Sequence, residues 1–341
     1  MSDENNSEEY YKSYENLDVH HLMLSDKPRT LAYRTAILNA KDKFVDKVVM
    51  DVGAGTGILS MFCAQAGAKK VYAVEASIIA ELIPDVAKEN NFENKIEVIQ
   101  KRVEDIAADE IEKVDIIVSE WMGFYLLHEG MLDSVIIARD RFLKQDGLIF
   151  PDTAKIYAAP CQLPSVHEFW DDVCGVKMRS VASQYIKAKI KPDVLDLPRE
   201  DLLGDGVLLV WLDLNTIDSE DLNSLGIEES IAICNKAGNY QGFCIWFDVD
   251  FPDGSTLSTS PFSESTHWKQ TIIVMPGTIK VEEKEPVAFN LKFDRNSEDC
   301  RKYNLSFTQL DPEEVSHPIP CDCYMTKCIV TKAFLESQEQ E

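Results

Sequence analysis

The 341-residue sequence has no long apolar run and no basic N-terminal segment. A helix needs about 20 consecutive apolar residues to cross a bilayer, whereas the longest apolar runs here, such as 206–212, have the length of a strand. The chain begins MSDENNSEEYY, unlike the basic and then apolar pattern of a secretory signal. We therefore expect a soluble protein of the cytoplasm, the nucleus or both, with no membrane partner.

Basic residues are scarce relative to acidic ones. The 34 Lys and Arg against 59 Asp and Glu give a formal net charge of −25. Such a charge repels phosphate backbones and attracts cationic partners. It argues against direct nucleic-acid binding, although a solubilising acidic surface explains it as well as attraction of a basic substrate does.

The nine cysteines lack the paired spacing of a disulfide framework or a zinc site. They are scattered and odd in number, which is typical of reduced, buried thiols. Cys321, Cys323 and Cys328 lie close together, but they contain no CxxC pair and we assign them no nearby histidine. The sequence therefore predicts no metal site.

The first part of the chain reads as a short tail followed by helices. Residues 1–9 are acidic and polar and are expected to be disordered, and residues 10–42 are expected to form a helical lid. Because proline is tolerated in a first helical turn, a helix is expected to begin near Pro28, with Asp26 close to its N-terminus.

Residues 43–151 alternate short apolar strands with helices, which predicts an α/β, Rossmann-like parallel sheet covered on both faces. Ligands of such a sheet bind at the carboxyl ends of its strands. The expected strands are 47–52, 70–75, 95–100, 114–120 and 148–150, and the expected helices are 58–66, 78–89 and 129–143.

Residues 152–341 consist mostly of strand-like segments with turn residues between them, which predicts an antiparallel β-barrel domain. A partly helical stretch at about 165–200 interrupts the series. The expected strands are 154–159, 207–214, 231–234, 242–251, 271–275, 287–293, 303–310 and 323–335.

A glycine-rich turn, DVGAGTG, joins the first expected strand to a helix. Gly53 and Gly55 would let the backbone turn tightly and approach a ligand closely. The third glycine comes one residue too early for the dinucleotide fingerprint, which argues against a nicotinamide oxidoreductase. A strand ending in an acid, Asp51, followed by GxGxG suits the aminoacyl end of S-adenosyl-L-methionine.

Acidic residues also end the next two strands. Glu75 closes the second strand, where a carboxylate can accept hydrogen bonds from both ribose hydroxyls of a nucleoside. Glu104 follows the third strand and is placed near an adenine amine. Each acid alone is most often a solvated charge, but together on successive strand ends they favour cofactor binding.

Glu120 and Glu129 flank an aromatic and apolar loop after the fourth expected strand. A guanidinium presents its N–H donors in a planar fork, so two carboxylates can hold it from two sides. By localising positive charge away from one nitrogen, they would raise its nucleophilicity toward a sulfonium methyl. The pattern predicts methyl transfer to arginine.

The residues SEWMG and HEGMLDS around these glutamates resemble the double-glutamate loop of the protein arginine N-methyltransferases. THW at 266–268 resembles that family's second hallmark, and YYKSY at 10–14 with the segment 23–30 resembles its N-terminal helix motifs. The resemblance runs from about residue 10 to the C-terminus. It is greatest to type I members, which make monomethyl- and asymmetric dimethylarginine.

The motifs and the resemblance together imply three sets of site residues. His267 would pair with Asp26 and either receive the released proton or act only as a core-capping histidine, while Met23 and Met131 would shape the pocket floor or simply pack. The implied catalytic residues are Glu120, Glu129, His267 and Asp26; the cofactor-binding residues are His20, Arg29 (toward the cofactor carboxylate), Asp51, Gly53, Gly55, Glu75 and Glu104; the substrate-pocket residues are Tyr14, Met23, Met131 and Trp268.

By the same resemblance, the stretch at about 165–200 matches a dimerisation arm, and Phe169 and Trp170 suit an interface of a homodimer. The alternative is a helical excursion that packs on its own barrel. The implied partners are basic protein substrates, namely histone tails and arginine/glycine-rich RNA-binding proteins. His21 and Leu22 stand where type I relatives often carry acids, and Pro28 precedes Arg29 directly, which bears on how the lid is ordered.

Two other kinds of methyltransferase fit less well. An adenine methyltransferase would carry an Asn/Asp-Pro-Pro-aromatic loop where SEWM stands, and the Pro-Cys pair at 160–161 lies beyond the sheet in which a cytosine-C5 enzyme would need it. A non-catalytic scaffold that keeps the fold and the cofactor remains the alternative from another class. A methyl-transfer assay on an arginine/glycine-rich peptide separates it from an enzyme.

Overall fold

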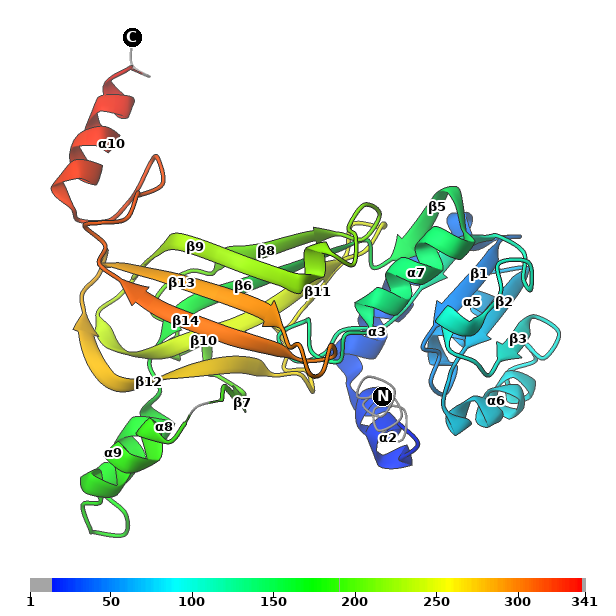
Figure 1. The fold of residues 1–341 in the computed structure, drawn as a ribbon, viewed down its shortest axis with the longest axis horizontal. Helices are drawn as coiled ribbons and strands as arrows, with labels where there is room; N and C mark the ends of the chain where they lie inside the picture. Colours follow the sequence, from blue (N-terminus) through cyan, green and yellow to red (C-terminus); the bar gives the residue numbers. More distant parts are fainter. Residues whose placement is uncertain (1–13, 190, 339–341) are drawn as a thin grey trace.

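The computed structural model describes residues 14–189 and 191–338. Figure 1 shows helices packed around a parallel sheet on one side, a large antiparallel part on the other, and two helical projections from the antiparallel part. The tail 1–9, predicted to be disordered, and residues 10–13 of the predicted lid lie outside the described residues.

The parallel sheet has the strand order β3-β2-β1-β4-β5. The chain moves outward from β1 to β3 and then returns to the other side of β1, so the carboxyl ends of β1 and β4 meet where the order reverses. Ligands of open α/β sheets bind at this place. The strands are β1 Val48–Val52, β2 Lys70–Val74, β3 Ile96–Ile99, β4 Val114–Val118 and β5 Leu143–Phe150.

Helices cover both faces of this sheet, and this explains why every residue of β1 is buried. Val49 packs in the same core as Ile37 and Phe62, whereas Met50 packs on the opposite face with Phe142. The helices of this half are α2 Leu17–Ser25, α3 Lys27–Asn39, α4 Lys41–Phe44, α5 Ile58–Gln65, α6 Ile83–Glu89 and α7 Leu132–Phe142, with short 3₁₀ turns η1 Ile78–Leu82 and η2 Val103–Asp105.

Two antiparallel sheets form the second part. One has the order β7-β12-β10-β6-β8 with β11 paired to β10, and the other has the order β14-β13-β9. Phe243 of β10 and Phe289 of β13 meet between them, with ring centroids 4.5 Å apart. The strands are β6 Thr153–Cys161, β7 Asp193–Leu195, β8 Val207–Asp213, β9 Ser224–Ile233, β10 Gly238–Asp250, β11 Thr256–Ser258, β12 Gln270–Val281, β13 Pro286–Arg295 and β14 Tyr303–Leu310.

The partly helical stretch at about 165–200 projects from this second part (Figure 1). Its rings form a small stack, because Trp170 lies 5.1 Å from Phe169 and 5.4 Å from Tyr185 between centroids. Phe169 is exposed, but Trp170, expected to be exposed, is half-buried. The elements are α8 Pro164–His167, η3 Glu168–Asp171 and α9 Arg179–Lys187, and two more 3₁₀ turns, η4 Arg199–Asp201 and η5 Asp221–Asn223, follow along the chain.

The predicted architecture, a Rossmann-like sheet followed by an antiparallel domain, is confirmed, but the strand expected at 323–335 is wrong. That segment forms α10, Thr326–Gln338 (Figure 1). Ile329, Val330 and Thr331 give the run a strand-like composition, yet Cys328 is the one buried residue among the described residues of this helix. The helix expected at 129–143 begins only at Leu132, because Glu129 and Gly130 have positive φ. No helix among the described residues is both long and apolar enough to span a bilayer.

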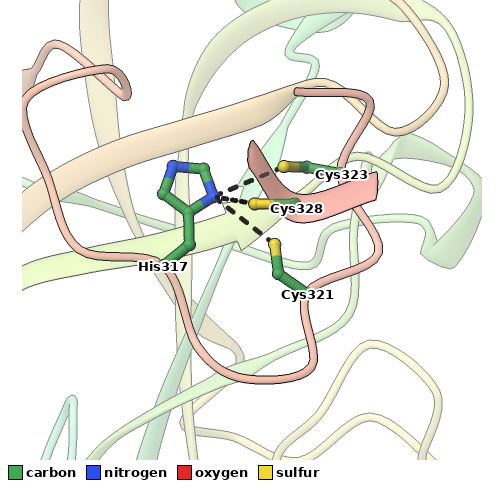
Figure 2. A group of neighbouring side chains, drawn as sticks. All are labelled: His317, Cys321, Cys323 and Cys328. Atoms are coloured by element: carbon green, nitrogen blue, oxygen red, sulfur yellow. Dashed lines mark hydrogen bonds between the residues drawn. The ribbon is translucent and has the colours of Figure 1, made fainter. Parts of the chain in front are cut away.

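The expectation that no histidine lies near the C-terminal cysteines is also wrong. His317 stands on the loop before them, and its ring faces the sulfur atoms of Cys321, Cys323 and Cys328 (Figure 2). The signal was present in the sequence as HPIPCDC. The four ligands lack the paired CxxC spacing of common zinc sites, and only the fold of the loop brings their side chains together.

Candidate active site

A cavity opens at the carboxyl ends of β1, β2 and β4, between α2 and the loop before β12. It gathers predicted site residues from six separate segments of the chain. The predicted residues that line it are Tyr14, His20, Met23, Arg29, Gly53, Gly55, Glu75, Glu104, Glu120, Glu129, Met131, His267 and Trp268, while Asp26 and Asp51 lie behind its wall.

The glycine turn after β1 has a backbone that other residues adopt with difficulty. Gly53, Gly55 and Gly57 have φ of +73°, +54° and +85°. A Cβ at Gly53 would lie 2.1 Å from the terminal methyl of Met131. The turn therefore brings bare backbone to the cavity wall, as close approach to a cofactor requires.

Glu75 and Glu104 occupy neighbouring strand ends, as predicted. The two carboxylate oxygens of Glu75 each accept a backbone N–H, from Gly55 and from Ser77, both at 2.8 Å. Glu104 accepts the hydroxyl of Ser134 at 2.6 Å. These bonds hold both acids at the cavity while leaving each oxygen further acceptor capacity.

Asp51 is fully buried in β1 and does not reach the cavity. One of its oxygens accepts the Ser60 hydroxyl at 2.7 Å, and within residues 14–189 and 191–338 the other has no hydrogen-bond partner. Burial raises the pKa of Asp51 to about 7, although the Ser60 bond opposes the rise. Asp51 thus joins β1 to α5, the helix that follows the glycine turn, and does not itself contact the cavity.

Glu120 holds a guanidinium in this structure, that of Arg29. Its Oε2 lies 2.8 Å from Nε and 2.6 Å from the second terminal nitrogen of Arg29, and both side chains are nearly buried. Arg29 also donates to the carbonyl of Met23 at 2.9 Å. The carboxylate raises the pKa of the Arg29 guanidinium against the opposing effect of burial. The structure thus pairs Arg29, expected to contact the cofactor, with Glu120.

Glu129 sits in a loop of unusual backbone conformation. Tyr125, Leu126 and Glu129 have φ of +46°, +75° and +82°, which non-glycine residues rarely adopt. The loop is held because the Glu129 N–H donates to the Arg301 carbonyl at 2.8 Å and Arg301 donates back to the Glu129 carbonyl at 2.9 Å. The Tyr14 hydroxyl donates to the Glu129 carboxylate. Such strain is typical of functional loops.

Asp26 joins the N-terminal helices to the barrel. One carboxylate oxygen lies 2.6 Å from Nδ1 of His267 and accepts its backbone N–H at 2.9 Å, and the other caps α3 by accepting the Arg29 N–H at 3.1 Å. Burial alone would raise the pKa of Asp26, but these bonds outweigh it and lower the pKa. The predicted contact between Asp26 and His267 is present.

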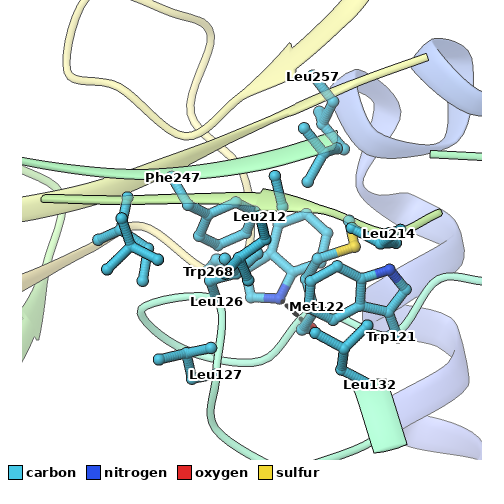
Figure 3. Packing of buried hydrophobic residues seen from close by; sticks show 14 of the residues in the cluster. Trp121, Met122, Leu126, Leu127, Leu132, Leu212, Leu214, Phe247, Leu257 and Trp268 are labelled. Atoms are coloured by element: carbon cyan, nitrogen blue, oxygen red, sulfur yellow. Dashed lines mark hydrogen bonds between the residues drawn. The ribbon is translucent and has the colours of Figure 1, made fainter. Parts of the chain in front are cut away.

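Trp268 lies beneath the double-glutamate loop. Its indole N–H donates to the carbonyl of Met122 at 2.9 Å, and it packs with Phe247 and Leu126 (Figure 3). The wall also contains residues that sequence reasoning missed, among them Ser134 and Arg301. Arg301 carries no local signal, because it comes from the loop before β14 and reaches Glu129 only in the folded chain.

Two family models match the chain. That of the arginine methyltransferase oligomerization subdomain matches residues 152–309, and that of the ribosomal protein L11 methyltransferase matches residues 35–133. The chain is 40% identical over 319 residues to protein arginine N-methyltransferase 6 of Danio rerio, covering 90% of each. It is 43% identical over 270 residues to protein arginine N-methyltransferase 1 of Schizosaccharomyces pombe, covering 77% of this chain and 78% of that protein.

Solved structures agree with these similarities. The Trypanosoma brucei PRMT1 enzyme-prozyme heterotetrameric complex with AdoHcy matches with a TM-score of 0.78 and 34% identity, covering 90% of this chain and 98% of that one. The crystal structure of PRMT6-SAH matches with a TM-score of 0.74 and 32% identity, covering 86% and 100%. Sequence, fold and the paired glutamates agree, and the chain therefore belongs to the protein arginine N-methyltransferase family.

Proposed function

We propose that this arginine methyltransferase makes monomethyl- and asymmetric dimethylarginine on basic proteins, among them histone tails and arginine/glycine-rich RNA-binding proteins. The cofactor is S-adenosylmethionine, which when bound supplies an electrophilic methyl group on its sulfonium. The glycine turn, Glu75 and Glu104 would hold it in the cavity at the strand ends. The net charge of −25 favours the approach of arginine-rich substrates.

One observation carries the proposal: a guanidinium already lies against Glu120. The Arg29 contacts at 2.8 and 2.6 Å occupy one oxygen, and the other accepts the Met122 N–H at 3.2 Å. A carboxylate has about four acceptor positions, so Glu120 can receive a further N–H from a substrate guanidinium. Glu129 lines the same cavity and would hold the opposite side.

The two carboxylates would activate the substrate by position and charge. They keep the positive charge on the nitrogens that they contact, and the remaining nitrogen presents its lone pair to the methyl carbon. The bound cofactor would supply the methyl group and leave as the neutral thioether. The methylated nitrogen then releases one proton, which we assign to His267, held at the cavity by Asp26.

Met23 and Met131 match the two methionines of type I members, and both line the cavity with the glutamates, which supports asymmetric dimethylarginine as the product. The test is mass spectrometry of an arginine/glycine-rich peptide after reaction, with the matched lysine/glycine peptide as control. Asymmetric dimethylarginine fragments with loss of dimethylamine, and the symmetric isomer with loss of monomethylamine. Symmetric product alone would contradict the proposal, and no label transfer with cofactor bound would favour the scaffold alternative.

We also propose that the protein acts as a homodimer in the cytoplasm, the nucleus or both. The projecting arm, defined as residues 164–187, presents exposed apolar side chains that include Phe169, Val176 and Tyr185. All nine cysteines are free thiols, which suits a reducing compartment.

A further inference from the structure

Four potential metal ligands meet on the C-terminal loop, at the far end of the barrel from the parallel sheet (Figure 1). His317, Cys321, Cys323 and Cys328 each offer one ligand atom, and these atoms all lie within 4.8 Å of one another. Figure 2 shows the three sulfurs on one side of the imidazole. We propose that this cluster is a structural Zn²⁺ site, independent of the methyl-transfer cavity.

The distances suit tetrahedral zinc. Nδ1 of His317 lies 3.4 Å from the Cys321 sulfur and 3.3 Å from each of the other two. With Zn–S near 2.3 Å and Zn–N near 2.1 Å, tetrahedral angles place nitrogen and sulfur about 3.6 Å apart. One cation at the centre therefore needs only small shifts of the four side chains.

The tautomer of His317 is the one that a metal requires. Its Nε2 lies 2.9 Å from the Pro312 carbonyl, an oxygen that can only accept, so the neutral ring has its proton on Nε2 and its Nδ1 lone pair toward the sulfurs. Metal-bound histidines commonly donate their other N–H to a backbone carbonyl in this way. The Nδ1 lone pair can accept one strong hydrogen bond, but the sulfurs of all three cysteines lie within 3.4 Å of this nitrogen. A metal ion bound by all four atoms explains this arrangement better than hydrogen bonds alone.

The donor set and its burial select the metal class and the role. Three soft thiolates with one imidazole favour Zn²⁺ over Mg²⁺ or Ca²⁺. The three cysteines are buried, and four protein ligands complete a tetrahedron without an open position. The site is therefore structural rather than catalytic.

The loop that carries the ligands is held by a small apolar core, by hydrogen bonds and by an ion pair between Asp322 and Lys332 of α10. Residues 311–325 form turns and bends, and the small core here consists of the three cysteines with Ile233 and Met325. The Tyr324 N–H donates to the Lys284 carbonyl at 3.2 Å, and Lys327 reaches the Val315 carbonyl at 3.3 Å. Zinc would join this loop to the first turn of α10, where Cys328 lies, and so anchor the C-terminal helix to the barrel.

The test is the zinc content of the full-length chain, produced with zinc in the medium and purified without chelator. Native and denaturing mass spectrometry should show one zinc per chain in the folded protein, with all thiols alkylated by iodoacetamide after unfolding. Replacing zinc with cobalt should give thiolate-to-cobalt charge-transfer absorption. His317→Ala and Cys328→Ser should lose most of the zinc, while Cys300→Ser, at an exposed cysteine outside the cluster, should keep it.

Zinc-free wild-type protein, full zinc in both variants, or a native disulfide among the three cysteines would each overturn the proposal. If a variant fails to fold, the wild type still decides: a chelator should release the zinc and make three thiols reactive to a thiol reagent. Zinc content is measured independently of methyl transfer. A protein that binds zinc but transfers no methyl group would therefore support the zinc site and contradict the proposed function.

Discussion

A single carboxylate oxygen of Glu120 receives two donors from the Arg29 guanidinium. The pair is nearly buried, and removal of one partner of such a pair leaves an uncompensated charge. Arg29 therefore orients Glu120 at the cavity wall, so that Glu120 both contacts the N-terminal helix α3 and lines the cavity. The resemblance implied two separate contacts instead, Arg29 with the cofactor carboxylate and Glu120 with a substrate guanidinium.

Glu120→Gln tests the charge of this residue with little change of shape. We expect kcat to fall by about 100-fold or more, because the amide cannot stabilise the developing cation. Thermal unfolding should confirm that the variant is folded, and Glu93→Gln, at an exposed glutamate, serves as the matched control. Turnover equal to that of the wild type would remove the basis for the proposed chemistry.

At the scale of elements, α3 begins where Asp26 caps it and Pro28 occupies its first turn. The same aspartate contacts His267 of the loop before β12. The residue that caps α3 therefore also joins the N-terminal helices to the antiparallel part of the molecule. Asn16 caps α2 in the same manner, by accepting the Asp18 N–H at 2.9 Å, and provides a comparison.

Asp26→Ala should lower the free energy of unfolding by about 3 kcal/mol, because it removes a cap and one partner of a buried pair. Asn16→Ala removes a cap alone and should cost about 1 kcal/mol. Urea unfolding of the two variants measures both values. Equal losses would mean that the contact with His267 contributes nothing to stability.

At the scale of the whole molecule, the arm projects away from the barrel and exposes Phe169, which is 56% accessible. Its base is anchored, since Ala182 and Ile186 of α9 are buried. A small anchored projection with exposed apolar side chains suits contact with a second chain. The matched oligomerization subdomain includes the whole of it.

Phe169→Asp should convert a dimer into a monomer, because a charge at this exposed apolar position of the arm would be buried in the interface without a partner. Sedimentation velocity measures the change, and deletion of residues 168–190 should have the same effect. Trp211→Asp, at an exposed aromatic residue of β8 outside the arm, should remain dimeric. An unchanged sedimentation coefficient in the Phe169 variant would exclude the arm as the interface.

The local sequence is sufficient to predict the place of a site residue where its motif directly follows a strand. The glycine turn leaves β1 and the double-glutamate loop leaves β4, so strand order alone brings them to one edge of the sheet. The start of α3 is equally predictable from the local sequence, since the cap Asp26 and the first-turn Pro28 lie two residues apart. The helix α10 was not predicted, because Ile329, Val330 and Thr331 favour a strand. The segment is a helix because the folded chain, over residues 14–189 and 191–338, places no strand beside it with which it pairs.

The amino-acid sequence by itself determined the class of the protein: a parallel sheet with a glycine turn, two glutamates on one loop and an antiparallel second domain. The tertiary structure decided the contacts between distant segments, such as Arg29 with Glu120, Arg301 with Glu129, and His317 with three cysteines. The reason is physical. Periodicity and turn chemistry act over a few neighbouring residues, whereas the partner of a buried charge or thiol is set by the packing of elements that the chain brings together only on folding.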